Sequence, residues 1–499
     1  MTLDVSLRFA LTGLTAAQRG LDVVSRNIGN ADTPGYTRKT FHQHHEIVNG
    51  VSSGVRTGPL TREMDKALQA QVIGRESEAR RHGVVERFLQ QVDALQGKPD
   101  AGMSLGSQVS QLQDSFVTLL DAPDSGPLRN DVLERADTLA RSLNQQSEMV
   151  TTLRNQAQAE IHDLMGTLNE NLRKIHELNK TLTTTTLLGG SAPDLEDQRD
   201  IALREVAKIV DITYFRDGNG AISINLANGQ PLLDGSYRAV TTEPTGISPI
   251  SYYEQGNPAS PIPPILLGGT ADITPYLKGG TLGGLIELRD DILPRMQAEL
   301  DEFAVTMARR FEDAGLTLFT DSTGTVPNGY VAPPAALDYV GFSFEIRVSA
   351  AVLADPTLLR DGDAGQPGGT DYAGYRDQIQ AVVDDVFGAP ASAALNFATA
   401  DLGPGPRTIS SKLPAGAGLA DFATEMITAN GVLSAETTLR LDTAEALRNQ
   451  FEQHLADKTG VNIDQEIGLL IQLQRSYSSS ARIITTNREM FNDLLNAVR

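Results

Sequence analysis

The first 28 residues carry an unbroken heptad pattern, in which apolar side chains recur at alternating intervals of four and three. The pattern predicts one helix of roughly 40 Å with a narrow apolar stripe along one side. Pro34 and Gly35 suit the two central positions of a type II turn, so the helix should end before them. This apolar stripe needs a second helix to cover it. It consists of Leu3, Leu7, Ala10, Leu14, Ala17, Leu21, Val24 and Ile28.

A second stripe with the same spacing runs to the end of the chain. Gln474 and Arg488 interrupt it, and polar residues at such core positions usually fix the register of paired helices at a cost in stability. An isolated helix is only marginally stable in water. Two interpretations follow: an intramolecular hairpin that closes an ordinary domain, or two assembly surfaces that neighbouring subunits complete. The second stripe consists of Ile463, Ile467, Leu470, Gln474, Tyr477, Ala481, Ile484, Arg488, Phe491, Leu495 and Val498.

The composition excludes several classes of protein and of site. A net charge of -21 argues against nonspecific binding of nucleic acid and against docking on an anionic membrane. No apolar run is long enough to span a bilayer, and the N-terminus has neither the basic nor the apolar region of a cleavable signal peptide. Cys is absent, which removes disulfides, thiolate nucleophiles and zinc–thiolate sites together.

Helical patterns continue beyond the N-terminal stripe. Apolar positions predict helices over residues 64–95 and 105–119. One very long helix should follow over residues 132–182, with Pro127 near its start. A further helix is expected over residues 193–209, where acids in the first turn suit the positive end of the helix dipole. The middle of the chain is therefore expected to be a rod-like helical trunk.

The apolar period then changes from that of a helix to that of strands. Asn228 and Gly229 are a strong hairpin signal, so β-hairpins are expected from about 210 to 280. A helix should return over residues 280–315, with Pro294 kinking it or marking its true start.

The pattern is weaker after residue 315. Phe342, Phe344, Ile346 and Val348 alternate like a strand. Residues 379–386 suggest one helix, 402–418 resemble a loop, and helix returns from Phe422 onward.

Three patterns could suggest chemistry, and each has a plainer interpretation. His42, His44 and His45 lie close together, but a strand would point the third away from the other two, so an exposed strand or loop is the better interpretation. The glycines of residues 279–284 match neither a Walker loop nor a dinucleotide fingerprint and favour close backbone packing. The acids of residues 194–200 are read as a solvated face. No catalytic residue, cofactor or metal is predicted.

Both chain ends resemble a known family. Residues 13–18, 24–31 and 33–38 resemble the N-terminal motif of the axial proteins of the bacterial flagellum, which are rod, hook and hook-associated proteins. Residues 476–477, 481–486 and 490–491 resemble the closing helix of the same family. Residues 460–466 resemble a pattern that usually ends in two or more acids; Gln465 departs from it, so no role is carried over to that position.

The middle of the chain resembles the hook-associated members of this family, which join hook to filament. That resemblance rests on residues 195–200, 209–210, 228–229 and 283–285 in that order. It implies a mainly α fold with a β-hairpin subdomain, elongated, with a long-helix trunk and with the terminal helices paired as a coiled coil.

Three parts are expected. Residues 1–62 with 440–499 should form a terminal coiled-coil assembly domain. Residues 63–319 with 341–439 should form the helical trunk. Residues 320–340 should be a short loop where many relatives carry an outer β domain.

The implied function is structural. The resemblance implies export without a cleavable signal peptide through the flagellum's own type III apparatus, and a place outside the cell at the hook–filament junction. The implied partners are other copies of the chain in a ring, the hook protein, a second junction protein, and an export chaperone on the C-terminal helix.

Two alternative functions remain: a divergent hook or distal-rod protein, and a secreted enzyme or adhesin that uses these termini only for export and anchoring. The residues expected to form the assembly interface are Leu3, Leu7, Leu14, Leu21, Val24, Asn27, Ile28, Asn30, Pro34, Gly35, Tyr36, Ile463, Ile467, Leu470, Tyr477, Ile484, Phe491 and Leu495.

Overall fold

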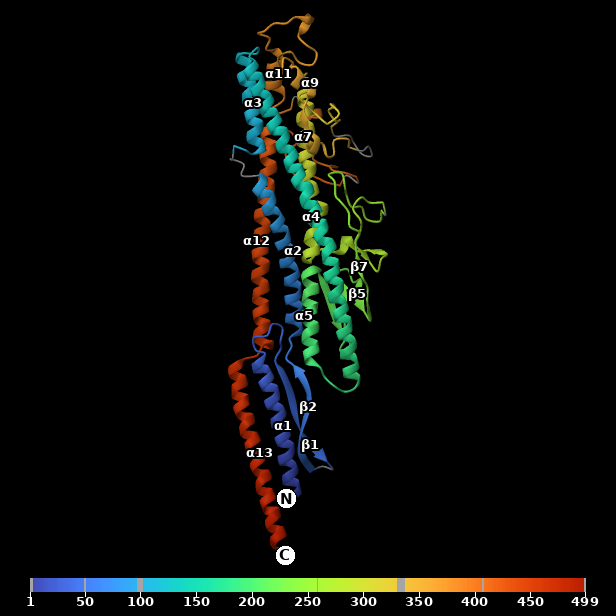
Figure 1. Ribbon diagram of the computed structural model, residues 1–499, viewed down its shortest axis with the longest axis vertical. Coiled ribbons are helices and arrows are strands. Elements are labelled where there is room, and N and C mark those ends of the chain that lie inside the picture. Colours follow the sequence, from blue (N-terminus) through green and yellow to red (C-terminus); the bar gives the residue numbers. More distant parts are fainter. Residues whose placement is uncertain are drawn as a thin grey trace. The chain divides into compact units, whose positions relative to one another are not determined.

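The computed structural model describes residues 3–48, 51–96, 102–257, 259–329, 337–390, 392–405 and 408–497. This part of the chain is mainly helical and carries small antiparallel sheets, as the sequence predicts (Figure 1). The chain divides into two compact units. Unit 1 contains residues 1–77, 167–238 and 444–499, and unit 2 contains residues 78–166 and 239–443.

Unit 1 is built around the first helix. Helix α1 (Leu3–Gly29) leads through a turn into strand β1 (Lys39–Val48), which pairs antiparallel with β2 (Val51–Arg62). Helix α13 (Ile463–Ala497) lies beside α1, and β2 packs on another side of α1 (Figure 1). Helix α5 (Pro193–Ile209) begins at a proline, as such helices often do, and contacts β2.

The predicted hairpins are confirmed. A four-stranded antiparallel sheet follows α5, in the order β3 (Ile212–Arg216), β4 (Ile222–Leu226), β5 (Pro231–Asp234) and β6 (Ser236–Tyr237). Alternate side chains of β4 are buried, which is the pattern of a sheet covered on one face. A smaller sheet, of β7 (Val240–Thr241), β8 (Leu266–Leu267) and β9 (Ala271–Asp272), belongs to unit 2.

Long helices provide most of the rest. These are α2 (Lys66–Gln96), α3 (Leu105–Asp121), α4 (Gly126–Leu187), α6 (Gly280–Glu287), α7 (Leu293–Asp313) and α12 (Leu419–Thr459). The 62 residues of α4 confirm the very long helix predicted from the apolar period.

The core of unit 2 contains two clusters of phenylalanine rings. Phe116, Phe311 and Phe387 form one, with ring centroids 5.7–6.1 Å apart. Phe303, Phe397 and Phe422 stack in the other.

Pro294 interrupts a helix, as expected. Five residues of π-helix, η2 (Leu288–Ile292), join α6 to α7 just before Pro294, and a π turn of this kind accommodates a break in the regular helical hydrogen bonds. The glycines before it pack closely, also as expected. A Cβ on Gly284 would lie 2.4 Å from Val84 Cγ1 and 2.7 Å from the carbonyl oxygen of Arg81 on α2.

The strand predicted at residues 342–348 is wrong in its first half. Phe342 to Glu345 form a short helix, α8 (Phe342–Glu345), and only β11 (Arg347–Val348) is a strand, paired with β10 (Phe319–Thr320). Gly341 has a φ of 88°. The buried carboxylate of Asp301 accepts hydrogen bonds from the amides of Gly341 (2.7 Å) and Ser343 (3.0 Å), and these contacts turn the chain where the side-chain pattern suggests an extended one.

The remaining segments are short and irregular. Helix α11 (Asp377–Asp385) confirms the helix expected near residue 379. Buried Arg310 on α7 holds the region that follows by donating to the carbonyl oxygens of Leu395 (3.2 Å), Gly388 (3.1 Å) and Ala417 (3.1 Å). The other short elements are η1 (Thr274–Tyr276), α9 (Ala350–Ala354), α10 (Leu358–Asp361), η3 (Pro367–Gly369) and η4 (Ala393–Leu395).

Candidate functional site: the paired terminal helices

Helices α1 and α13 run antiparallel in one fixed register. Asn487 Nδ2 donates to Ser6 Oγ at 2.9 Å, and Asn27 Nδ2 donates to Glu466 Oε2 at 3.1 Å. Between these bonds, a Cβ on Gly13 would lie 3.2 Å from Ser480 Oγ, and a Cβ on Gly20 would lie 2.8 Å from Leu473 Cδ1. Each step is seven residues on both helices, so the contacts follow one heptad position of each. The pairs are Ser6–Asn487, Gly13–Ser480, Gly20–Leu473 and Asn27–Glu466.

The apolar stripe of α1 is divided between buried and half-buried side chains. Its smaller members Ala10, Ala17 and Val24 are buried. Its larger members Leu7, Leu14, Leu21 and Ile28 are only half-buried, and the side chain of Leu3 lies outside the described residues. Small residues let the two helices approach closely, which leaves the leucines at the edge of the contact.

The hairpin covers another side of α1. Thr12 Oγ1 accepts a hydrogen bond from the amide of Val55 at 3.2 Å, and Arg19 Nη1 donates to Thr57 Oγ1 at 2.8 Å. Along β1 the side chains of His42, His44 and His45 are exposed, as the sequence predicts for a solvated strand.

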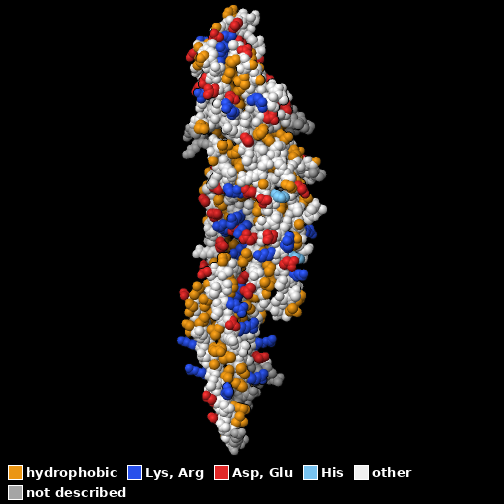
Figure 2. Space-filling model, viewed as in Figure 1, with side chains coloured by type: hydrophobic (Ala, Val, Ile, Leu, Met, Phe, Trp, Pro, Cys, Tyr) orange, Lys and Arg blue, Asp and Glu red, His pale blue; other side chains and the backbone are white. Residues whose placement is uncertain are grey.

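Helix α13 leaves most of its stripe uncovered. Leu470 and Ile484 are half-buried, while Ile463, Ile467, Tyr477, Phe491 and Leu495 are 39–54 % exposed. The register places Leu3 opposite Met490, so the last turns of α13 lie beyond the described start of α1. Figure 2 shows hydrophobic side chains gathered over the part of the chain that holds these two helices.

Asn27 joins the end of α1 to three other segments. Its side chain is 1 % exposed and makes four hydrogen bonds. Its Oδ1 accepts from the amide of Lys39 and from the hydroxyl of Tyr36, both at 3.0 Å, and its Nδ2 donates to the carbonyl oxygen of Lys39 (3.0 Å) and to Glu466. Every donor and acceptor of the amide is satisfied, so Asn27 positions the neighbouring segments and offers no free group to a partner.

The turn after α1 has the predicted type. The amide of Tyr36 donates to the carbonyl oxygen of Thr33 at 3.1 Å, and Gly35 has a φ of 79°, the value that a type II turn requires at its third residue. Pro34 is exposed, and Asn30 is half-buried and donates to the carbonyl oxygen of Arg26 at 2.9 Å. Burial and the charge of Asp194 raise the pKa of Tyr36 to about 12.

Buried ion pairs surround this turn, and the sequence did not predict them. Glu466, which is fully buried, accepts from Arg38 Nε at 2.7 Å. Asp197 of α5 accepts hydrogen bonds from Thr37 (2.7 Å), Lys39 and Arg62 (3.0 Å). The view of residues 194–200 as a solvated face is therefore wrong for Asp197 and Asp200, which are buried and paired. No local signal in the sequence marks these acids, because their partners Thr37 and Arg62 lie 160 and 135 residues away in the chain.

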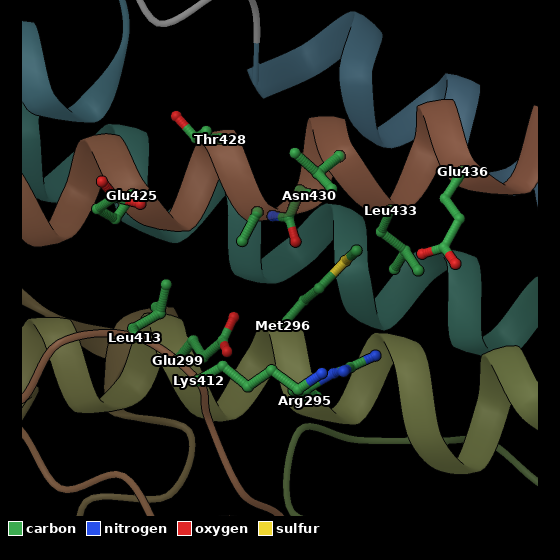
Figure 3. A pocket seen from close by; sticks show the side chains of 12 residues that line it. Arg295, Met296, Glu299, Lys412, Leu413, Glu425, Thr428, Asn430, Leu433 and Glu436 are labelled. Carbon is green, nitrogen blue, oxygen red and sulfur yellow. The ribbon is translucent and has the colours of Figure 1, made fainter.

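Unit 2 contains a cavity that is separate from the paired helices. It measures about 310 Å³ and lies among α7, α12 and the segment at Lys412 (Figure 3). Its walls mix cations with acids, and its buried acid Glu299 already accepts from Ser411 Oγ at 2.7 Å. Among the described residues no group of three His, Asp or Glu could hold a metal, and no described helix has the length and apolar character needed to cross a bilayer.

Family models match the chain at three places. The model described as "Flagellar hook-associated protein FlgK helical domain" matches residues 89–324. The model "Flagella basal body rod protein" matches residues 7–37, which hold most of α1 and the turn after it. The model "Flagellar basal body rod FlgEFG protein C-terminal" matches residues 455–497, which hold α13.

Curated relatives with one name match as well. "Flagellar hook-associated protein 1" of Escherichia coli strain K12 is 23 % identical over 556 residues, which cover 98 % of each chain. The same protein of Bacillus subtilis strain 168 is 22 % identical over 529 residues, covering 99 % of this chain and 98 % of that one. The Salmonella typhimurium protein is 26 % identical over 317 residues, or 61 % of this chain; the match spans about half (55 %) of that relative's length.

One solved structure is also similar, the flagellar hook junction protein FlgK from Burkholderia pseudomallei. The TM-score is 0.43 at 22 % identity, over 54 % of this chain and 47 % of that chain.

Proposed function

Because this chain belongs to the family of flagellar hook-associated protein 1, we propose that it is a structural subunit of the bacterial flagellum that joins hook to filament. The observation that carries the proposal is the pairing of α1 with α13, which leaves large apolar side chains of both helices facing outward. The family is structural, and the paired termini offer a surface for assembly.

Assembly is driven by the side chains that the pair leaves uncovered. Fully burying one Leu, Ile or Phe side chain stabilises a contact by roughly 1.5–3 kcal/mol. Ile463, Ile467, Phe491 and Leu495 are exposed, and Leu7, Leu14 and Leu21 are half-buried. Neighbouring subunits that cover both sets convert the pair into part of a coiled-coil layer, with residues 1–62 and 440–499 as the assembly domain and the helical segments between them as the trunk.

The proposed partners follow from this position. Other copies of the chain form a ring, the hook protein lies on one side of it, and a second junction protein lies on the other. Before assembly an export chaperone covers α13, since an uncovered apolar stripe invites aggregation. The protein leaves the cell through the flagellar export channel and acts outside the cell.

Electron microscopy of a strain that lacks the protein tests the function. Hooks without filaments are expected, and the wild-type gene should restore the filaments. Filaments that attach normally without the protein would refute the proposal.

A matched pair of variants tests the surface. Ile467→Asp places a charge on the exposed stripe of α13 and should leave hooks bare although the chain folds. Ser479→Asp adds the same charge at an exposed polar position of α13 and should restore filaments to the strain that lacks the protein. Equal results from the two variants would show that the stripe is not the assembly surface.

A further inference from the structure

The central contacts between α1 and α13 do not by themselves select one register. Gly13 faces Ser480 and Gly20 faces Leu473, and both helices repeat these positions every seven residues. A slide of seven residues would place Gly20 against Ser480, or Gly13 against Leu473, and keep the same sides together. Such a slide moves one helix by roughly 10 Å along the other.

A buried carboxylate breaks this degeneracy. Glu466 is 0 % exposed and has two charged or polar partners, Asn27 Nδ2 at 3.1 Å and Arg38 Nε at 2.7 Å. In one slipped register Glu466 would face Gly20, and in the other it would lie past the end of α1. Either slide removes Asn27 from Glu466, and a buried charge that loses its partners strongly disfavours the state that contains it.

We infer that Glu466, held by Asn27 and Arg38, determines the register in which α13 pairs with α1. Ser6 and Asn487 add a second polar contact three heptads away, at 2.9 Å. The register decides which apolar side chains the pair presents, and how far Phe491 and Leu495 extend beyond the described start of α1. That consequence rests on the proposed function, whereas the register itself does not.

The absence of Cys from the chain permits a direct test. In the full-length monomer, Gly13→Cys with Ser480→Cys reports the native register. Gly20→Cys with Ser480→Cys, and Gly13→Cys with Leu473→Cys, report the two slides. Dilute protein is oxidised, and intramolecular disulfides are quantified by mass spectrometry. The native pair should exceed each slipped pair by at least about tenfold.

Glu466→Leu should reduce that ratio to within about threefold, because the Gly13 and Gly20 contacts repeat in the slipped registers and the contact of Ser6 with Asn487 alone still favours the native one. Glu466→Gln, which still accepts from Asn27, should keep most of the preference. Gln465→Leu is the matched control at an exposed neighbour and should leave the ratio unchanged. Asn27→Asp places a second carboxylate against that of Glu466, so it should weaken the preference for the native register as Glu466→Leu does.

Each result decides the inference. An unchanged ratio in both Glu466→Leu and Asn27→Asp overturns it. A parallel loss of all three disulfides also overturns it, because Glu466 would then serve folding without selecting a register. The assay uses isolated monomers, so a strain that attaches filaments without the protein would refute the proposed function and leave this result intact.

Discussion

Single polar side chains in unit 1 connect segments that are far apart in the sequence. Asp197 of α5 holds Thr37, Lys39 and Arg62, which come from the turn after α1 and from both strands of the hairpin. Lys39 is itself 3 % exposed, and Asp197 is the carboxylate nearest to its ammonium group. Loss of one partner from a buried pair usually costs more than the pair contributes when intact.

Asp197→Asn should therefore lower the free energy of unfolding by about 3 kcal/mol, because buried Lys39 loses its nearest carboxylate and Arg62 loses one of its three. Asp194→Asn is the control: Asp194 lies on the same helix, 3.7 Å from Lys39, but is largely exposed and should change stability by less than about 1 kcal/mol. Urea unfolding followed by circular dichroism measures both. Equal losses of stability in Asp197→Asn and Asp194→Asn would show that the buried ion pairs contribute no more than an exposed one.

Gly35 is a position where the backbone needs glycine. Its φ is 79°, and a Cβ would lie 2.7 Å from Ile201 Cγ1. Gly35→Ala should destabilise the chain by about 1–2 kcal/mol, since an L-residue is strained there. Gly29→Ala, at the end of α1 with open space around it, should be neutral or stabilising by up to about 1 kcal/mol. A thermal unfolding scan distinguishes them, and a Gly35→Ala chain as stable as Gly29→Ala contradicts the assignment of the turn.

Asp301 makes the stability of unit 2 depend on pH. Burial raises its pKa from 3.8 to about 6, despite donors from Ser343, Gly341 and Gln297. The folded chain therefore holds this proton where the unfolded chain has lost it, and the contribution to stability falls as pH rises from about 4 to about 6. Across that range the loss should reach about 3 kcal/mol.

Asp301→Asn should remove this slope, whatever its effect on stability at one pH. The comparison is urea unfolding at about pH 4, 5, 6 and 7 for wild type, Asp301→Asn and Glu312→Gln, an exposed acid on the same helix. Parallel curves for the wild type and Asp301→Asn would show that Asp301 does not titrate in this window.

At the level of elements, periodicity predicted the helices well and their contacts less well. The long apolar periods of α4 and α13 and the prolines at the starts of α5 and α7 carry strong local signals. The leucine stripe of α1 did not show which side of the helix faces α13. Ser6, Gly13, Gly20 and Asn27 form a parallel line with the same spacing, one residue before Leu7, Leu14, Leu21 and Ile28, and spacing cannot show which line meets the partner.

The polar contacts could not be predicted for a different reason. The pair of Asn27 with Glu466 joins residues 439 positions apart, and the pair of Thr37 with Asp197 joins residues 160 apart. Local propensity contains no information about such partners. The resemblance at both chain ends singled out Asn27 as a residue of interest, while the structure assigns it a place between α1, β1 and α13.

The contact between α6 and α2 depends on the absence of a side chain. Gly284→Ala should destabilise unit 2 by about 1–3 kcal/mol, because the new Cβ meets both Val84 and the backbone of Arg81. Gly166→Ala lies in an exposed part of α4 with open space and should stabilise its helix by about 0.5–1 kcal/mol. In urea unfolding the two variants should change the free energy of unfolding in opposite directions. A change in the same direction would contradict the close packing of α6 on α2.

At the scale of the whole molecule, the chain combines a well-packed unit 2 with terminal helices whose apolar surface is only partly covered. Unit 2 buries the six phenylalanines of its two ring clusters, whereas α13 exposes Ile463, Ile467 and Leu495. Gly13 and Gly20 contribute no side chain to the α1–α13 contact, and most apolar side chains of the α13 stripe stay exposed to water. Regions with few buried apolar contacts open at low free energy, and here they coincide with the proposed assembly surface.

Amide hydrogen exchange should therefore differ between the chain ends and the trunk. In the isolated monomer, α1 and α13 should exchange rapidly, while α7 and the middle of α4 should be strongly protected, because only the latter are covered on most sides. In assembled flagella the same two terminal helices should become protected, since neighbouring subunits cover their apolar side chains. Strong protection of both ends in a dilute monomer would show that the pair is complete by itself and would remove the physical reason for assembly through these helices.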